Sequence, residues 1–85
     1  MTDVIVTFKI MPTGVDVNLD KLEKDVVREI KPQRTEREPI AFGLIAVNVT
    51  VLVPDEEGQL EKVENKLREL EGVEGVEVTE ITRSI

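Results

Sequence analysis

The strongest constraint on this 85-residue chain is the run from Leu44 to Val53, in which only Asn48 and Thr50 are polar. Its β-branched residues favour a strand, and a strand that is apolar on both faces belongs in the middle of a sheet. A chain of this length has room for one small core, so the remaining elements have to cover this strand. The sequence therefore predicts one sheet-based domain over residues 1–85.

Two segments space their apolar residues by three and four, as amphipathic helices do. The first begins after Asn18, a good helix cap, and runs to Ile30, because Pro32 then stops it. The second runs from Gln59 to Leu70 after a turn-forming cluster. These patterns predict two helices of similar length.

Three further segments have strand or loop character. Asp3–Met11 alternates and predicts a strand, whereas Gln33–Ile40 is polar and contains a proline, which favours a loop or a short edge strand. In the last segment Val76 and Val78 alternate but Ile81 falls out of register by one, which predicts a bulge.

The resulting order is strand, helix, strand, strand, helix, strand. It predicts an α+β fold of the ferredoxin-like, split βαβ type (βαββαβ) with a four-stranded antiparallel sheet and both helices on one face. Asp3–Met11 and Leu44–Val53 are expected to be the central strands. Since many unrelated activities use this architecture, the fold alone assigns no function.

Composition excludes several classes of chemistry. The net charge is −7, the basic residues are not clustered, and there are two Phe with no Trp or Tyr, which argues against direct binding of nucleic acid. Without Cys or His there are no disulfides, imidazole bases or ordinary zinc sites. The start, Met1-Thr2-Asp3, and the short apolar runs predict neither a signal peptide nor a membrane span.

The sequence gives weak support for a catalytic carboxylate pair or a phosphate-binding loop. Glu56 and Glu57 precede a helix and are best explained by its N-terminal dipole. The Gly72 to Gly75 segment lacks the spacing of a phosphate-binding loop. The Pro12-Thr13-Gly14 turn could serve a small-ligand-sensing or assembly module, so this second function class stays open.

Phe42 stands between Pro39 and Gly43 directly before the long apolar run. Pro39 favours extended geometry for the residue before it, and Gly43 can adopt backbone angles that a Cβ forbids. We therefore expect a tight bend that carries Phe42. Two interpretations are open: the ring is buried as a plug in the core, or it is exposed and contacts a partner protein.

Three segments resemble the archaeal translation elongation factor 1-beta family: Glu38–Leu44, the helix Asp20–Ile30 and the ending Val76–Ile85. The resemblance extends over essentially the whole chain and to the C-terminal exchange domain of longer eukaryotic relatives. It implies a ferredoxin-like guanine-nucleotide exchange factor that releases GDP from elongation factor 1-alpha, the GTPase that carries aminoacyl-tRNA to the ribosome.

The resemblance also implies the partner-binding residues. Phe42 matches the aromatic loop residue of the family, and Arg83 matches a lysine near the C-terminus. In eukaryotic members both are directed toward the switch and Mg²⁺ region of the GTPase. Arginine carries a planar guanidinium where lysine carries a compact ammonium, so the role of the family lysine need not pass to Arg83. The alternative is that Arg83 is a solvated charge at a frayed C-terminus. The residues that shape the loop around the ring are Pro39, Ile40, Ala41 and Gly43.

Exchange of this kind involves no bond chemistry, so the resemblance implies that the chain is not an enzyme. Its partner is elongation factor 1-alpha with GDP and Mg²⁺ bound, and the chain itself needs no metal or cofactor. We expect a cytoplasmic monomer that contacts neither nucleic acid nor membrane directly.

Overall fold

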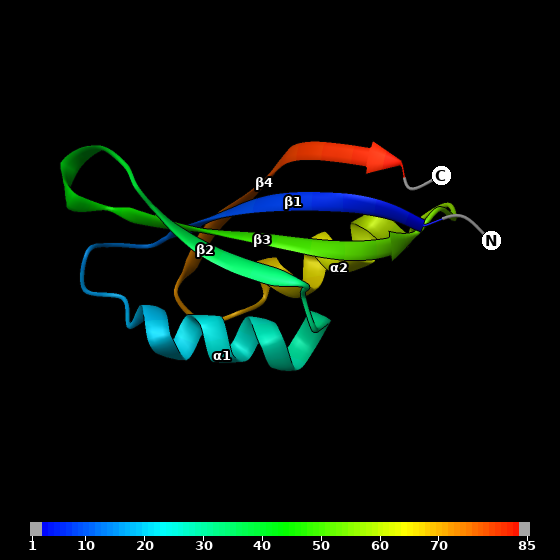
Figure 1. Ribbon diagram of the computed structural model, residues 1–85. Helices are drawn as coiled ribbons and strands as arrows, with labels where there is room; N and C mark the ends of the chain where they lie inside the picture. Colours follow the sequence, from blue (N-terminus) through cyan, green and yellow to red (C-terminus); the bar gives the residue numbers. More distant parts are fainter. Residues whose placement is uncertain (1–2, 84–85) are drawn as a thin grey trace.

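A computed structural model describes residues 3–83, with the exception of the side chain of Arg83. The order of the elements repeats strand, helix, strand twice along the described chain, with a short 3₁₀ turn between the two halves (Figure 1). Its elements are β1 (Asp3–Pro12), α1 (Leu19–Ile30), β2 (Arg34–Pro39), the 3₁₀ turn η1 (Ala41–Gly43), β3 (Ile45–Pro54), α2 (Gln59–Arg68) and β4 (Val73–Arg83).

The four strands form one antiparallel sheet in the order β2-β3-β1-β4. Both helices lie on the same side of this sheet (Figure 1). The α+β ferredoxin-like prediction is therefore confirmed, with β1 and β3 central as expected. The polar segment before Pro39 is an edge strand, and α2 ends at Arg68, two residues before the predicted Leu70.

The core lies between the helices and the inward face of the sheet. Alternate residues of β1 and β3 point into it, and Phe8 is the largest side chain that is completely buried. Leu22 and Val26 of α1 and Leu67 of α2 close the core from the helix side. The other buried members are Val4, Val6, Ile10, Val47, Val49, Val51, Val53 and Val76.

The helix ends follow the chemistry of their sequence. The Asn18 side chain accepts a hydrogen bond from the Lys21 backbone N–H at 3.1 Å, which caps α1 as predicted. Lys31, directly before the proline that stops the helix, is left-handed with φ 47°. On α2, Glu64 pairs with Arg68 one turn later, the favourable order for a helix.

The predicted bulge lies in β4. Thr7 pairs with Glu80 and Phe8 with Val78, so Thr79 has no residue opposite it. Its hydroxyl instead donates a hydrogen bond to the Thr7 carbonyl at 3.2 Å. The extra residue places Ile81 opposite the buried Val6, which explains why the apolar pattern changes register there.

The edge strand β2 is attached to α1 by an ion-pair cluster. Arg37 Nη2 lies 2.5 Å from Asp20 Oδ1 and 2.8 Å from Glu23 Oε1, and Arg37 Nε donates to Glu23 Oε2 at 3.3 Å. The hydrogen bonds to Glu23 and then Asp20 raise the pKa of Arg37 further above its usual value. Sequence periodicity gave no sign of this link, because its partners are 14 and 17 residues away.

Candidate partner-binding surface

The loop between β2 and β3 is a closed turn. The Ile40 N–H donates to the Leu44 carbonyl at 2.8 Å, and the Leu44 N–H donates to Ala41 at 3.3 Å. Within it Phe42 is left-handed with φ 62° and ψ 28°, and Gly43 follows with φ 77°. A left-handed residue with a Cβ is strained by about 1 kcal/mol or more, so this turn holds Phe42 in a costly conformation.

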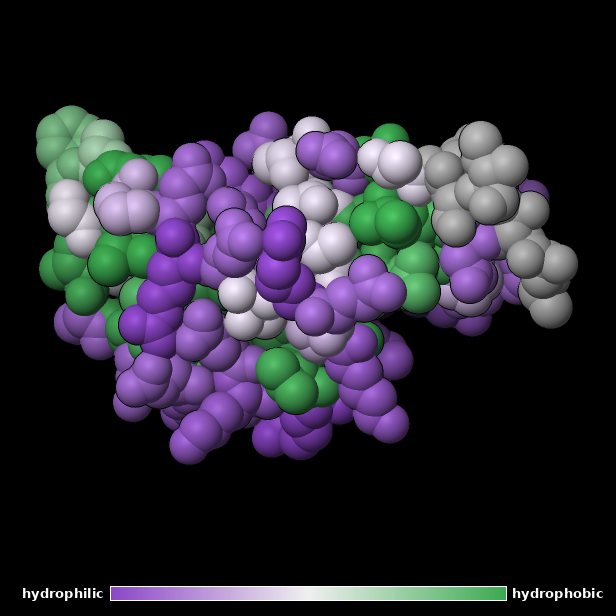
Figure 2. Space-filling model, viewed as in Figure 1, coloured by the Kyte–Doolittle hydropathy of each residue, from purple (hydrophilic) through white to green (hydrophobic). Residues whose placement is uncertain are grey.

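Phe42 is 94% exposed, the highest value among the exposed large apolar residues of the described chain. The interpretation of its ring as a plug in the core is therefore wrong, whereas Phe8, the other aromatic residue, is fully buried. Figure 2 shows apolar surface at the left-hand end of the molecule, where the turn lies in Figure 1. The structure thus presents the ring to solvent at one tip of the sheet.

The other residues predicted to shape this loop are part of the same tip. Pro39 pairs with Ile45 as the last residue of β2. Ile40 is half-buried below the turn, while Ala41 and Gly43 are exposed beside the ring. The structure therefore brings the predicted Pro39–Gly43 group together around Phe42.

A polar network fixes the end of β2 that carries the turn. Asn48 Nδ2 donates to Glu38 Oε1 at 3.0 Å, and Lys9 Nζ approaches the same oxygen at 4.0 Å. These residues come from β3, β2 and β1, so the base of the loop is connected to three strands. Such a base limits how far the tip can move.

Arg83 lies far from this tip. Its backbone pairs with Val4 at the start of β1, whereas Val47, on the loop side, pairs with Ile10. Six residues of strand separate these rows, or roughly 20 Å, and the turn extends beyond that. The structure therefore does not bring Arg83 and Phe42 together, and the side chain of Arg83 lies outside the described part of the chain.

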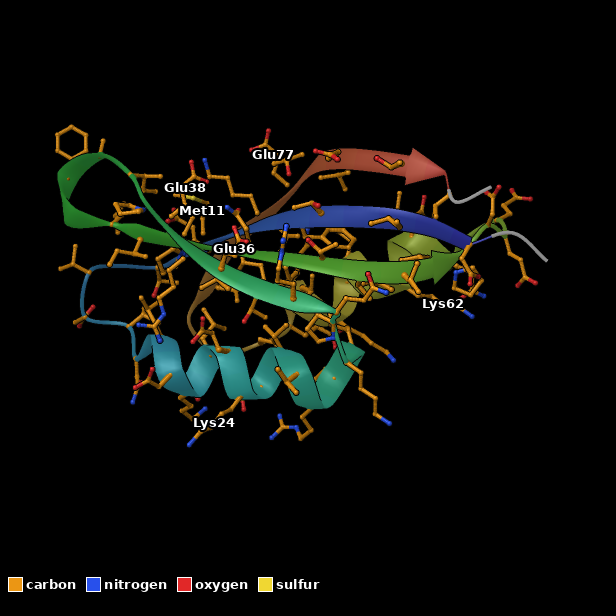
Figure 3. All side chains as sticks on the ribbon, in the orientation of Figure 1. Met11, Lys24, Glu36, Glu38, Lys62 and Glu77 are labelled. Atoms are coloured by element: carbon orange, nitrogen blue, oxygen red, sulfur yellow. The ribbon has the colours of Figure 1, made fainter. Side chains whose placement is uncertain are left out.

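The sheet face opposite the helices is open and mostly polar. Figure 3 shows Met11, Glu36, Glu38 and Glu77 on the side of the sheet away from α1, while Lys24 projects from α1 in the opposite direction. Glu36 pairs with Arg34 at 3.1 Å and Glu38 lies 4.0 Å from Lys9, so acidic and basic side chains occur together on this face near the loop end.

The Pro12–Gly14 turn, the alternative ligand site, is tied into the fold. The Thr13 N–H donates to the Gly72 carbonyl at 2.9 Å. Lys21, the cation nearest the hollow beside this turn, pairs with Asp25 at 3.1 Å and with Glu71 at 3.6 Å. The hydrogen bond to Asp25, and then the charges of Asp25 and Glu71, raise the pKa of Lys21 above 10.5. This cation is therefore occupied within the protein.

The described residues 3–83 contain no group of three His, Cys, Asp or Glu side chains that could hold a metal ion. They also contain no helix long and apolar enough to cross a membrane.

Val15 is a tip residue that sequence reasoning missed. It lies in the turn between β1 and α1 and is 69% exposed. A Cβ placed on Gly43 would lie 3.7 Å from Val15 Cγ1, so the two loops touch. The sequence feature that could have indicated it is an apolar residue in a turn beside a glycine, between Gly14 and Asp16, as Phe42 is beside Gly43.

Comparison with known proteins identifies the family. Residues 5–83 match the EF-1 guanine nucleotide exchange domain. The chain belongs to the elongation factor 1-beta exchange family. Elongation factor 1-beta of Methanothermobacter thermautotrophicus is 47% identical over 77 residues, which cover 85% of each chain. The proteins of the same name from Thermococcus gammatolerans and Saccharolobus solfataricus are each 42% identical and cover 95% and 98% of this chain, or 94% and 97% of their own.

Membership of this family sets the function. The chain is a guanine-nucleotide exchange factor of translation elongation, and the family implies interaction with the GTPase elongation factor 1-alpha. The resemblance seen in the sequence is confirmed, and the small-ligand-sensing alternative is set aside.

Proposed function

We propose that residues 1–85 act as one exchange domain, which binds GDP- and Mg²⁺-loaded elongation factor 1-alpha through the η1 turn. The observation that carries this proposal is the 94% exposure of Phe42 in a strained, hydrogen-bonded turn. An aromatic ring on a hydrogen-bonded turn loses little backbone entropy on binding, and exposed aromatic rings are typical energetic anchors of interfaces. Pro39, Ile40, Ala41 and Gly43 position that anchor.

The two ends of the sheet perform different tasks in this proposal. A bound Mg²⁺ and its phosphates occupy a site only a few ångströms across, whereas the row of Arg83 lies roughly 20 Å from the loop end of the sheet. We assign the cation to the Mg²⁺ and phosphate region, where a positive charge competes with the ion. Phe42 then contacts a separate part of the GTPase.

The mechanism requires no bond to be made or broken by the factor. Mg²⁺ links the GTPase to the nucleotide phosphates, so displacing or misplacing the ion weakens GDP binding. Because the coupling free energy is reciprocal, the factor weakens GDP by the same ratio by which GDP weakens the factor. This chain is accordingly proposed to be an exchange factor and not an enzyme of bond chemistry.

We assign the factor as a cytoplasmic monomer that contacts neither nucleic acid nor membrane directly. The formal charge of −7 argues against contact with nucleic acid or membrane, since phosphate backbones and anionic lipid surfaces would repel the chain. The same charge favours a partner with a basic or Mg²⁺-containing face.

The proposal is tested by the release of a fluorescent GDP analogue from elongation factor 1-alpha of the same organism. Unlabelled GTP is added in excess, and the release rate is followed as the concentration of the factor increases. We expect the rate to rise and then saturate, and to depend less on factor when Mg²⁺ is removed with a chelator. A release rate that stays at its intrinsic value at every factor concentration would contradict the proposal.

A further inference from the structure

Val15 and Phe42 are the two most exposed large apolar residues of the described chain, at 69% and 94%. They are 27 residues apart in sequence and belong to different loops. The other exposed large apolar residues, Val27, Leu52 and Ile81, lie on α1, β3 and β4. Only the first two lie on loops that meet at one end of the sheet.

The contact between the two loops is direct. The backbone of Gly43 approaches Val15 so closely that a Cβ there would lie 3.7 Å from Val15 Cγ1. Pro12 and Val17 on one side and Gly43 and Ile45 on the other line the same small crevice. The exposed residues Val15, Ala41 and Phe42 therefore belong to two loops that meet at Gly43, and we call these three residues the apolar tip.

The apolar tip is free of charge in a chain with 34% charged residues. The segments Ile10–Val15 and Pro39–Val47 contain no Asp, Glu, Lys or Arg, and the first charge beside the tip is Asp16. Depletion of charge around an aromatic side chain is the composition of the centre of a protein interface. A merely soluble end of this acidic protein would not require it.

Both loops are held by backbone hydrogen bonds. The turn of Phe42 is closed by the Ile40 and Leu44 amides, and the turn of Val15 is attached to the α2–β4 connection through the Thr13 N–H. Beyond Val15, Val17 packs against the core. A surface made of such loops is already in place before the partner arrives.

We propose that Val15 is a second apolar contact for elongation factor 1-alpha, so that the apolar tip docks as one unit into an apolar cleft of the GTPase. This inference rests on the proposed role of Phe42, because Val15 lies against the turn that carries that ring. A second copy of the chain is the weaker occupant: two side chains expose roughly 300 Å², well below the ~800 Å² per partner of a stable interface. Acidic lipid surfaces are disfavoured by the charge of −7.

The test compares Val15→Ser with a matched control. Val27→Ser makes the same change at a half-exposed valine on α1, away from the tip. The factor concentration that gives half-maximal GDP release is measured for both variants and for Phe42→Ala. We expect Val15→Ser to raise this concentration by about five- to tenfold, and Val27→Ser to leave it unchanged within about twofold.

A double variant separates one docking unit from two independent contacts. If Val15 and Phe42 enter the same cleft, the combined loss in Val15→Ser/Phe42→Ala is smaller than the product of the single losses. Light scattering and melting curves of each variant check its mass and folding. Since Val15 is exposed, its serine variant should melt within a few degrees of the parent.

Each result decides the inference. A normal half-maximal concentration for Val15→Ser beside a large increase for Phe42→Ala would overturn it while leaving the proposed function intact. Normal values for both would refute the inference and the role of Phe42 together. A parent that is dimeric, and becomes monomeric in both variants without loss of exchange, would assign the tip to self-association instead.

Discussion

The two phenylalanines of this chain provide a matched pair for separating stability from partner binding. Phe8 is fully buried in β1, and Phe42 is 94% exposed on the η1 turn. Replacement by Ala removes the same atoms at both positions. We therefore expect the two variants to fail in opposite assays.

At Phe8 the cost is in folding. Truncation of a buried phenylalanine costs roughly 3–5 kcal/mol, and an 85-residue domain has only about 4–13 kcal/mol in total. The melting temperature of Phe8→Ala should fall by at least about 12 °C. The fraction that remains folded should still promote GDP release, because the tip is unchanged.

At Phe42 the cost is in binding. The exposed ring offers about 200 Å² of surface, worth roughly 5 kcal/mol of gross burial, of which about 2 kcal/mol remains as net affinity after docking costs. Phe42→Ala should thus lose roughly 30-fold in the exchange efficiency, defined as the rate constant per unit factor concentration. Its melting temperature should stay within a few degrees of the parent.

A glycine at the same position sharpens the test. The left-handed backbone of Phe42, with φ 62°, strains alanine as much as phenylalanine but does not strain glycine. Phe42→Gly should therefore be more stable than Phe42→Ala by up to about 1 kcal/mol and equally deficient in exchange. Differential calorimetry and fluorescent GDP release measure both quantities. A Phe42→Ala variant that melts far below the parent but exchanges normally would refute this reasoning.

Three further changes test other parts of the structure. Arg83→Glu should slow factor-dependent GDP release, most at low salt and with Mg²⁺ present, with little change in melting temperature, while Arg83→Lys should be mild. An unaltered rate in the Glu variant would remove the cation from the mechanism. Arg37→Met removes the ion pair with Glu23 and should loosen the edge strand β2. We expect faster amide hydrogen exchange in β2 and a lower melting temperature, and the difference in melting temperature from the parent should shrink in 1 M salt. Unchanged protection of the β2 amides would contradict this prediction. The pKa of Lys21 is raised by Asp25, so the stability that this pair contributes is complete below pH 10.5 and is lost as the pH rises through the raised pKa. Lys21→Met should therefore lose less free energy of unfolding than the parent over this alkaline range. Equal pH dependence of stability in parent and variant would contradict this prediction.

The sequence by itself determined the elements that depend on local rules. The Asn18 cap and the following proline at position 32 define α1, because capping and the missing proline N–H act within a few residues. The apolar, β-branched runs of β1 and β3 predicted the two central strands, as the sheet order has them, because residues of this type pack well against neighbouring strands on both sides. Even the β4 bulge was readable, because one shifted residue, Ile81, broke the alternation.

The apolar tip could be located in the sequence only in part. A phenylalanine between Pro39 and Gly43 indicates a bend, but the same pattern fits a ring that points into the core. The left-handed backbone of Phe42 and the closure of the turn by Leu44 decide that it points outward. These depend on how β2 and β3 pair, which is a property of the whole sheet.

Tertiary structure alone decided the relations between distant segments. The contact of Val15 with the η1 turn joins residues that are far apart in the chain, and the Arg37 link to α1 does the same for the edge strand. The separation of Arg83 from Phe42 likewise follows from the register of β1 with its two neighbours. Local propensity and periodicity act over a few residues, whereas these distances are set by how the antiparallel sheet brings strands together.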